Sequence, residues 1–160
     1  MKNLEIYIHI PFCVRKCEYC DFLSFPADDD AKLRYVKGLM AEMIFYGPLM
    51  KNYQVSSVYI GGGTPSSIDE QWIAALMEGV FDCFNVLPDA EISIECNPGT
   101  LSREKLLAYR DAGINRLSIG LQSANNDELK LLGRIHTFEQ FVTNYEVARN
   151  VGFKNINVDL

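Results

Sequence analysis

Three cysteines, Cys13, Cys17 and Cys20, lie within eight residues of one another. Thiolates this close in sequence converge on one point when a metal ion, an iron–sulfur cluster or a disulfide holds them. A structural zinc site is normally closed by four protein ligands, and most 4Fe–4S clusters use one cysteine on each iron. Three cysteines therefore indicate a cluster whose remaining iron is open to another ligand.

Zinc binding and a disulfide are the alternatives for these cysteines. A zinc site would need a fourth ligand such as His9, but a histidine inside an apolar strand is more often a satisfied core residue. The chain has five cysteines, and this odd number favours metal binding over a disulfide framework. We expect the other two, Cys83 and Cys96, to pack as small apolar side chains in the core.

Further polar and glycine residues follow other apolar runs. The sequence Gly61-Gly62-Gly63-Thr64-Pro65 lets a backbone approach a ligand closely, although a tight turn explains it about as well. Its spacing is not that of a nucleotide-phosphate loop.

Several single polar residues are also candidates. Glu95 ends an apolar run and, if buried, needs a partner such as a ribose hydroxyl or an ammonium group; otherwise it is a solvated strand end. Gln122 is a weaker candidate of the same kind. Arg134 and His136 flank a helix break, where surface positions are equally compatible with the pattern.

Strands and helices alternate along the chain. Strand-like runs cover residues 4–10, 57–60, 91–96, 115–119 and 155–160. We expect helices from Asp28 to Tyr46, from a capping box at Ser67 and Glu70, over 101–112 before Gly113, over 127–132 before Gly133, and from a capping box at Thr137 and Gln140.

This alternation predicts an α/β fold with parallel strands joined by right-handed crossovers. An open doubly wound sheet carries site residues only beside its switch point. Here all five strand ends carry them, which favours an incomplete (β/α) barrel of five parallel strands with helices outside. A complete eightfold barrel typically needs about 250 residues. Residues 1–160 thus read as one domain that ends inside a strand, the N-terminal part of a longer barrel protein whose last barrel unit and C-terminal domain are absent.

Composition limits the partners. The formal net charge is −6 and the isoelectric point is about 4.9, which argues against binding a nucleic-acid backbone. No apolar run approaches the roughly 20 residues of a membrane span. The N-terminus passes directly into a strand that contains Glu5, unlike a secretory signal. We expect a soluble, cytoplasmic protein.

Residues 7–22, which contain the three cysteines, resemble the signature of the radical S-adenosylmethionine (SAM) superfamily. They are most similar to the branch that holds oxygen-independent coproporphyrinogen III oxidases and HemW-type heme chaperones. Blocks at 61–65, 95–98, 115–123, 132–136 and 157–160 resemble further family blocks and follow in the same order. The resemblance covers the whole chain and implies a barrel of the radical SAM type.

The resemblance implies that Cys13, Cys17 and Cys20 hold a 4Fe–4S cluster whose open iron binds the methionine end of SAM. The residues it assigns to SAM are Tyr7, Tyr19, Gly62, Gly63, Thr64, Glu95, Gln122, Arg134 and Asp159. Of these, Gln122, Arg134 and Asp159 match a second SAM site that only part of the family has. The implied chemistry is the transfer of one electron from the cluster to SAM, and the protein binds, orients and shields the reactants.

Two features separate the members of this branch. The oxidase pattern has a further cysteine two residues after the third, where this chain has Phe22. The oxidase also has a long N-terminal extension, whereas this sequence begins a few residues before its first strand. Both features favour a heme chaperone that binds heme in the full-length protein and transfers it to an acceptor protein. A flavodoxin or ferredoxin would be the electron donor. The alternatives are a coproporphyrinogen oxidase, with a porphyrin substrate, and a zinc-stabilised binding domain.

Overall fold

The computed structural model describes residues 2–160 and contains one parallel five-stranded sheet. The strands are β1 (Lys2–Ile10), β2 (Tyr53–Gly62), β3 (Val86–Cys96), β4 (Arg116–Gly120) and β5 (Asn155–Asp159). The helices are α1 (Asp29–Tyr46), α2 (Glu70–Cys83), α3 (Arg103–Asp111), α4 (Asn126–Leu131) and α5 (Phe138–Asn150). Short 3-10 turns cover Gly47–Met50, Pro65–Ser67 and Pro98–Thr100.

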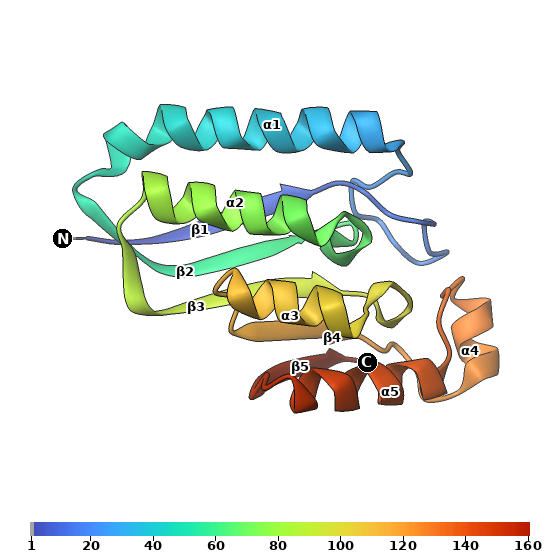
Figure 1. The fold of residues 1–160 in the computed structure, drawn as a ribbon. Coiled ribbons are helices and arrows are strands. Elements are labelled where there is room, and N and C mark those ends of the chain that lie inside the picture. The colour runs from blue at the N-terminus through green and yellow to red at the C-terminus, as the bar shows by residue number, and fades with distance from the viewer. Residues whose placement is uncertain (1) are drawn as a thin grey trace.

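The strands lie in the sheet in their order along the chain, β1-β2-β3-β4-β5. A doubly wound sheet reverses its strand order at a switch point, and this sheet does not. Because right-handed crossovers that advance in one direction place their helices on one face, α1, α2, α3 and α5 line the same side of the sheet (Figure 1). The sheet is open, with β1 and β5 at its edges, so the predicted incomplete barrel is confirmed.

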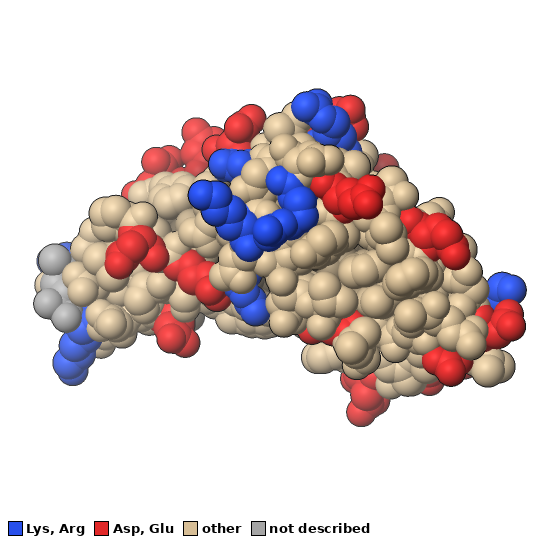
Figure 2. Space-filling view, turned by 90° about the horizontal axis from the view of Figure 1, so that it is seen from below, with Lys and Arg blue, Asp and Glu red and all other residues tan. Residues whose placement is uncertain are grey.

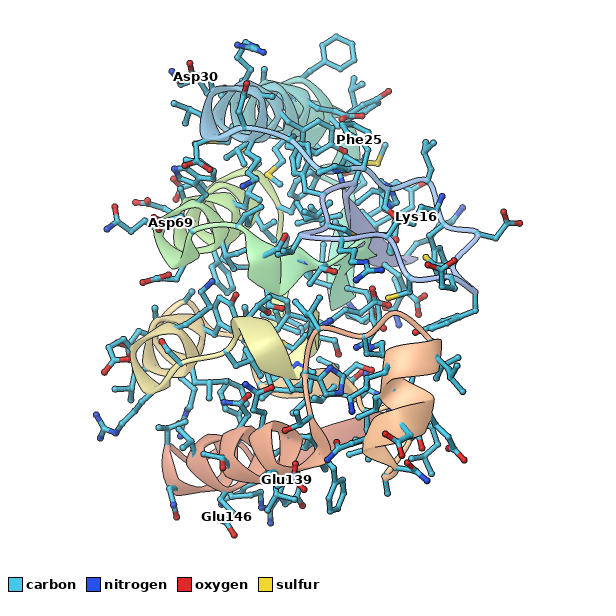
Figure 3. All side chains as sticks on the ribbon, turned by 90° about the vertical axis from the view of Figure 1, so that its right-hand side faces the viewer. Lys16, Phe25, Asp30, Asp69, Glu139 and Glu146 are labelled. Atoms are coloured by element: carbon cyan, nitrogen blue, oxygen red, sulfur yellow. The ribbon has the colours of Figure 1, made fainter. Side chains whose placement is uncertain are left out.

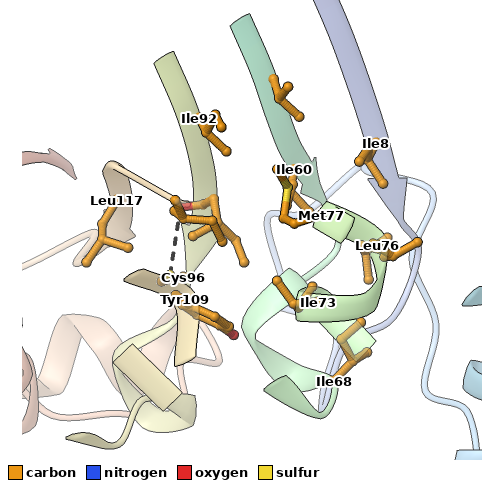
Figure 4. Packing of buried hydrophobic residues seen from close by; sticks show 14 of the residues in the cluster. Ile8, Ile60, Ile68, Ile73, Leu76, Met77, Ile92, Cys96, Tyr109 and Leu117 are labelled. Atoms are coloured by element: carbon orange, nitrogen blue, oxygen red, sulfur yellow. Dashed lines mark hydrogen bonds between the residues drawn. The ribbon is translucent and has the colours of Figure 1, made fainter. Parts of the chain in front are cut away.

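The core lies between the sheet and its helices. Alternate strand residues such as Ile60, Ile94 and Leu117 point toward the helices and are fully buried. They pack against helix residues that include Met77 and Tyr109 (Figure 4). Since successive strand residues face opposite sides, the intervening residues project onto the other, concave face.

Polar side chains cap the helix starts, as the sequence predicts. Asp28 caps α1 by accepting from the backbone N–H of Ala31, and Thr137 and Gln140 form the expected capping box of α5. The predicted capping box at Ser67 is wrong. Residues 65–67 form a 3-10 turn instead, and the N-cap of α2 is Asp69.

The starts of two strands differ from the prediction by several residues. β2 and β3 begin earlier than their apolar runs, because the parallel ladder continues through polar residues and past a register shift between Val55 and Ser57. β5 is partly buried over its three middle residues. It is an edge strand paired only with β4, with Asn155 and Asp159 exposed.

Charged side chains are distributed unevenly on the surface. On the side seen in Figure 2, several Lys and Arg side chains gather in one central group, others lie apart near the edges of the view, and acidic side chains are scattered between them. Among the described residues, no helix has the length and hydropathy needed to cross a membrane.

Candidate functional site

The cysteine loop joins β1 to α1 and is pinned at its base. The backbone N–H of Cys13 donates to the carbonyl of Phe25 at 3.2 Å, and that of Phe25 donates to the carbonyl of Pro11 at 3.0 Å. The buried Phe12 ring meets Phe25 edge to face at 5.7 Å. These contacts bring the loop back over the end of the sheet, so its position depends on β1 and not only on the cysteines.

The three cysteines line one open cavity at the carboxyl ends of the strands. Figure 3 looks onto this end of the sheet, with the loop that carries Lys16 on the side away from α2 and α3. The predicted residues that line this cavity are Cys13, Cys17, Cys20, Tyr19, Gly62, Gly63, Thr64, Glu95, Gln122, Arg134 and Asp159. The structure thus brings together residues from all parts of the chain, and their roles toward a cluster or SAM stay predictions.

The glycine segment packs directly against the cysteine loop. The N–H of Gly63 donates to the carbonyl of Ile10 at 2.8 Å, and that of Thr64 donates to the carbonyl of Phe12 at 2.7 Å. A Cβ on Gly63 would lie 2.7 Å from the oxygen of Phe12 and 2.9 Å from Sγ of Cys13. A side chain at this position would therefore push the Cys13 thiol away, which is a reason for glycine that the sequence does not reveal.

Glu95 lies on the concave face, and two donors fix its carboxylate. Oη of Tyr59 donates to Oε1 at 2.9 Å, and the N–H of Gly62 donates to Oε2 at 2.9 Å. Burial, followed by the negative charge of Glu95, raises the pKa of Tyr59 to about 12. Tyr59 therefore remains a donor at neutral pH, and the carboxylate keeps lone pairs free for a cationic or hydroxyl ligand.

Arg134 connects the far side of the cavity to the cysteine loop. Its Nη2 donates to the carbonyl of Gly120 at 2.8 Å, and its Nη1 donates to Oη of Tyr19 at 3.3 Å and to Sγ of Cys17 at 3.7 Å. Its Nε is buried without a partner. Arg134 also lines the cavity, where its positive charge favours an anionic group.

Asp159 and Gln122 lie beside each other at the ends of β5 and β4. Oγ of Ser118 donates to Oδ2 of Asp159 at 3.1 Å, and the N–H of Gln122 donates to the backbone oxygen of Asp159 at 2.9 Å. Gln122 has a φ of 67°, a left-handed conformation that few residues other than glycine adopt. Its side chain is thereby turned back over Gly120, where its amide oxygen would lie 2.7 Å from an added Cβ.

Tyr7 is the one predicted site residue that does not line the cavity. Its side chain is 57% exposed, and its Oη lies 3.1 Å from Nδ1 of His9. The other ring nitrogen of His9, Nε2, lies 3.4 Å from the carbonyl oxygen of Leu23. Both nitrogens of His9 thus have partners other than the cysteines.

All five cysteines are free thiols in this structure. Cys96 is buried as expected, burial raises its pKa, and it also reaches the cavity wall. Cys83 is only partly buried.

The three cysteines of the loop and residues of opposite charge line the cavity. Within residues 2–160, no three His, Cys, Asp or Glu side chains are grouped as ligands of one metal ion. Separate irons of a cluster each take their own thiolate, so the three thiols need not share one centre. Glu95 and Arg134 both line this cavity, and their opposite charges suit the ammonium and the carboxylate of a zwitterionic ligand.

The sequence alone did not reveal several residues that support the site. Tyr59 and Ser118 hold the carboxylates of Glu95 and Asp159, and Ser66 accepts from the N–H of Asn97 at 3.0 Å. The available signal was the alternation of polar and apolar residues in β2 to β4, which places Tyr59 and Ser118 on the same face as Glu95.

Known proteins match the chain over nearly its whole length. A family model described as the Radical SAM superfamily matches residues 7–160. The heme chaperone HemW of Escherichia coli (strain K12) is 39% identical over 163 residues, which cover 98% of this chain and 42% of that protein. HemW of Bacillus subtilis (strain 168) is 39% identical over 155 residues, covering 96% and 41%.

Two further relatives bear oxidase names. The oxygen-independent coproporphyrinogen-III oxidase-like protein HemZ of B. subtilis is 38% identical and covers 99% of this chain and 33% of that protein. The structure of E. coli coproporphyrinogen III oxidase (HemN), described as a radical SAM enzyme, superposes with a TM-score of 0.91 at 33% identity. The superposed region covers 99% of this chain and 37% of the HemN chain.

The chain spans about two fifths of the length of the HemW proteins it matches. The family model covers all but the first residues of the chain, and the fold and the order of the motifs agree with it. This chain therefore belongs to the Radical SAM superfamily.

Proposed function

We propose that the chain binds a 4Fe–4S cluster through Cys13, Cys17 and Cys20, with SAM on the iron that no cysteine holds. The observation that carries this proposal is the shared cavity, which the three cysteines, the glycine segment and Glu95 all line. A reduced cluster of this kind supplies one electron that cleaves a carbon–sulfur bond of SAM. The protein's own residues provide binding, orientation and shielding.

Each part of the cavity suits one part of SAM. The Glu95 carboxylate, held by Tyr59 and the Gly62 N–H, has acceptor capacity left for an ammonium or a ribose hydroxyl. The bare backbone of Gly62 and Gly63 admits a ligand where a Cβ would intrude. Arg134 lines the same cavity, and its positive charge suits a carboxylate.

For the whole protein, we propose a HemW-like heme chaperone of the cytoplasm that binds heme and transfers it to an acceptor protein. The identity of 39% to two HemW proteins supports this role. Phe22 supports it as well, since it lines the cavity at the position where the oxidase pattern has a cysteine. A flavodoxin or ferredoxin would supply the electron.

Oxidative decarboxylation of coproporphyrinogen III is the second candidate function, because the HemN structure superposes so closely on this chain. An anaerobic oxidase assay on the whole gene product, with SAM and a reductant, separates the two functions. Formation of the decarboxylated porphyrinogen would favour the oxidase. Heme binding without product would favour the chaperone.

Anaerobic reconstitution tests the metal site. We expect iron, sulfide and cluster absorbance in the native chain, and their loss in Cys17→Ala. Cys83→Ala is the matched control, because Cys83 lies at the end of α2, away from the cavity, and it should keep the full cluster. One zinc per chain and no iron after anaerobic purification would instead support a zinc-stabilised binding domain.

A further inference from the structure

Two of the three cysteine sulfurs accept a hydrogen bond from a side chain outside the cysteine loop. Oγ1 of Thr64 donates to Sγ of Cys13 at 3.4 Å, and Nη1 of Arg134 donates to Sγ of Cys17 at 3.7 Å. Thr64 follows β2, and Arg134 lies between α4 and α5. Separate parts of the fold therefore each supply one donor to one thiol.

Backbone contacts hold both donors in place. The N–H of Thr64 donates to the Phe12 carbonyl at 2.7 Å, within one residue of Cys13. On the other side, the N–H of Glu18 donates to the Leu132 carbonyl at 3.2 Å, and the Arg134 N–H donates to the carbonyl of Leu129 at 2.9 Å.

The guanidinium of Arg134 is anchored independently of Cys17. Its Nη2 donates to the Gly120 carbonyl at the end of β4, at 2.8 Å. A Cβ on Gly133 would lie 3.5 Å from Cγ of Glu18 and 3.6 Å from Cα of Cys17, in ordinary van der Waals contact, so the segment before Arg134 lies against the loop. The contact between Arg134 and Cys17 is thus part of a packed junction between two segments.

We propose that Thr64 and Arg134 are positioning residues that hydrogen bond the ligand thiolates of Cys13 and Cys17 and thereby raise the reduction potential of the bound cluster. The inference rests on the cluster binding proposed above. Hydrogen bonds to the sulfurs of an iron–sulfur cluster are among the factors that set its potential. One-electron reduction makes the cluster more negative, so a donor or a positive charge at a thiolate stabilises the reduced form more than the oxidised form.

This role differs from contact with SAM and can be measured without it. The experiment is a redox titration of the anaerobically reconstituted chain in the absence of SAM, with the reduced cluster followed by electron paramagnetic resonance. Arg134→Gln removes the charge and shortens the donor, Arg134→Lys keeps the charge, and Thr64→Val removes only the hydroxyl at nearly constant shape. Arg34→Gln, at an exposed site on α1, and Thr143→Val, on α5, are the matched controls.

We expect Arg134→Gln to lower the equilibrium constant for one-electron reduction about tenfold, a shift of about 59 mV toward more negative potential. Thr64→Val should lower the same equilibrium constant a few-fold. The potential of Arg134→Lys should fall between those of the native chain and Arg134→Gln, and the potentials of the two controls should match that of the native chain. Native-like potentials in both Thr64→Val and Arg134→Gln would overturn the inference.

Two other outcomes are informative. If Thr64→Val and Arg134→Lys both fold like the native chain but assemble no cluster, the two residues are needed for assembly, and the tuning role is wrong. If the native chain itself binds no iron and sulfide, the proposed function fails, and this result is distinguishable because it does not depend on any variant.

Discussion

The Glu95 carboxylate is bound on two sides before any ligand reaches it. Tyr59 and the N–H of Gly62 each donate to one of its oxygens at 2.9 Å. This arrangement fixes the direction of the remaining lone pairs, which helps to orient a cationic or hydroxyl ligand. Tyr59 lies one strand away from Glu95, so it acts on a ligand only through this carboxylate.

Tyr59→Phe should therefore weaken SAM binding without loss of the cluster. Removal of one hydrogen bond to a charged group typically costs about 1.5 kcal/mol, so we expect the dissociation constant for SAM to rise about tenfold. Calorimetric titration of the reconstituted chain measures this change. Tyr53→Phe, at the opposite end of β2, is the control and should bind SAM normally. Equal affinity in Tyr59→Phe and the native chain would contradict the role given to Tyr59.

His136 makes the stability of the fold depend on pH. Burial, and then the charge of Arg134, lower the pKa of His136 from 6.5 to about 4. The unfolded chain binds the proton more readily, so the free energy of unfolding should fall as the pH drops from about 6.5 to about 4, by at most about 1.4 kcal/mol per pH unit. Above pH 6.5 this contribution is constant.

Urea unfolding of the native chain and of His136→Gln over this pH range tests the assignment. Gln keeps a donor for the Leu121 carbonyl, which lies 3.3 Å from Nε2 of His136, but it does not titrate. The native chain should lose more stability on acidification than the variant. Parallel curves for the two proteins would show that His136 does not titrate as described.

At the scale of elements, the sequence predicted most of the fold because local signals and burial agree. Helix caps at Asp28 and Thr137 and the glycines after α3 and α4 mark real boundaries. The prediction failed at Ser67, where the chain turns once more before α2. That turn depends on tertiary contacts that the local pattern does not contain.

The site was less predictable than the fold. The sequence grouped the cysteines, the glycine segment and Glu95 by their places after strands, and the structure puts these residues around one cavity. It left Tyr59 and Ser66 out, because a tyrosine or serine in a strand or turn has many ordinary explanations. Their partners lie 36 and 31 residues away, so only the folded chain brings them together.

Lys105 shows how one helix holds a loop of the site. From α3, its Nζ donates to the carbonyls of Ser66 at 2.9 Å and Ile68 at 3.0 Å. Lys105→Met would leave both carbonyls of the turn after β2 without this donor. We expect the free energy of unfolding to fall by about 2 kcal/mol.

Denaturant unfolding measures this loss. The matched control is Lys37→Met at an exposed position of α1, which should change stability by less than about 0.5 kcal/mol. A native-like stability for Lys105→Met would mean that water replaces the ammonium at this site at little cost. Then Lys105 would not hold the turn.

At the scale of the whole molecule, the open sheet leaves edge strands at β1 and β5. An edge strand presents unpaired backbone groups that can pair with another chain. Leu160 beside β5 is 88% exposed, which adds apolar surface at that edge. We expect the chain of 160 residues to self-associate as its concentration rises, measured by sedimentation.

A lysine on the edge should reduce this association. Asn155→Lys places a charge on β5, and Asn150→Lys places the same charge at the end of α5 as a control. Weaker association in Asn155→Lys alone would identify the β5 edge as the contact. A chain that stays monomeric at all concentrations would show that both edges are protected.

The most direct test of the account is electron paramagnetic resonance of the anaerobically reconstituted and reduced chain, recorded with and without SAM. If three thiolates leave one iron open, the chain should contain about four irons and show the signal of a reduced 4Fe–4S cluster, and added SAM should change that signal. Cys17→Ala should show no such signal. A cluster signal that SAM leaves unchanged, or one that survives in Cys17→Ala, would contradict the account.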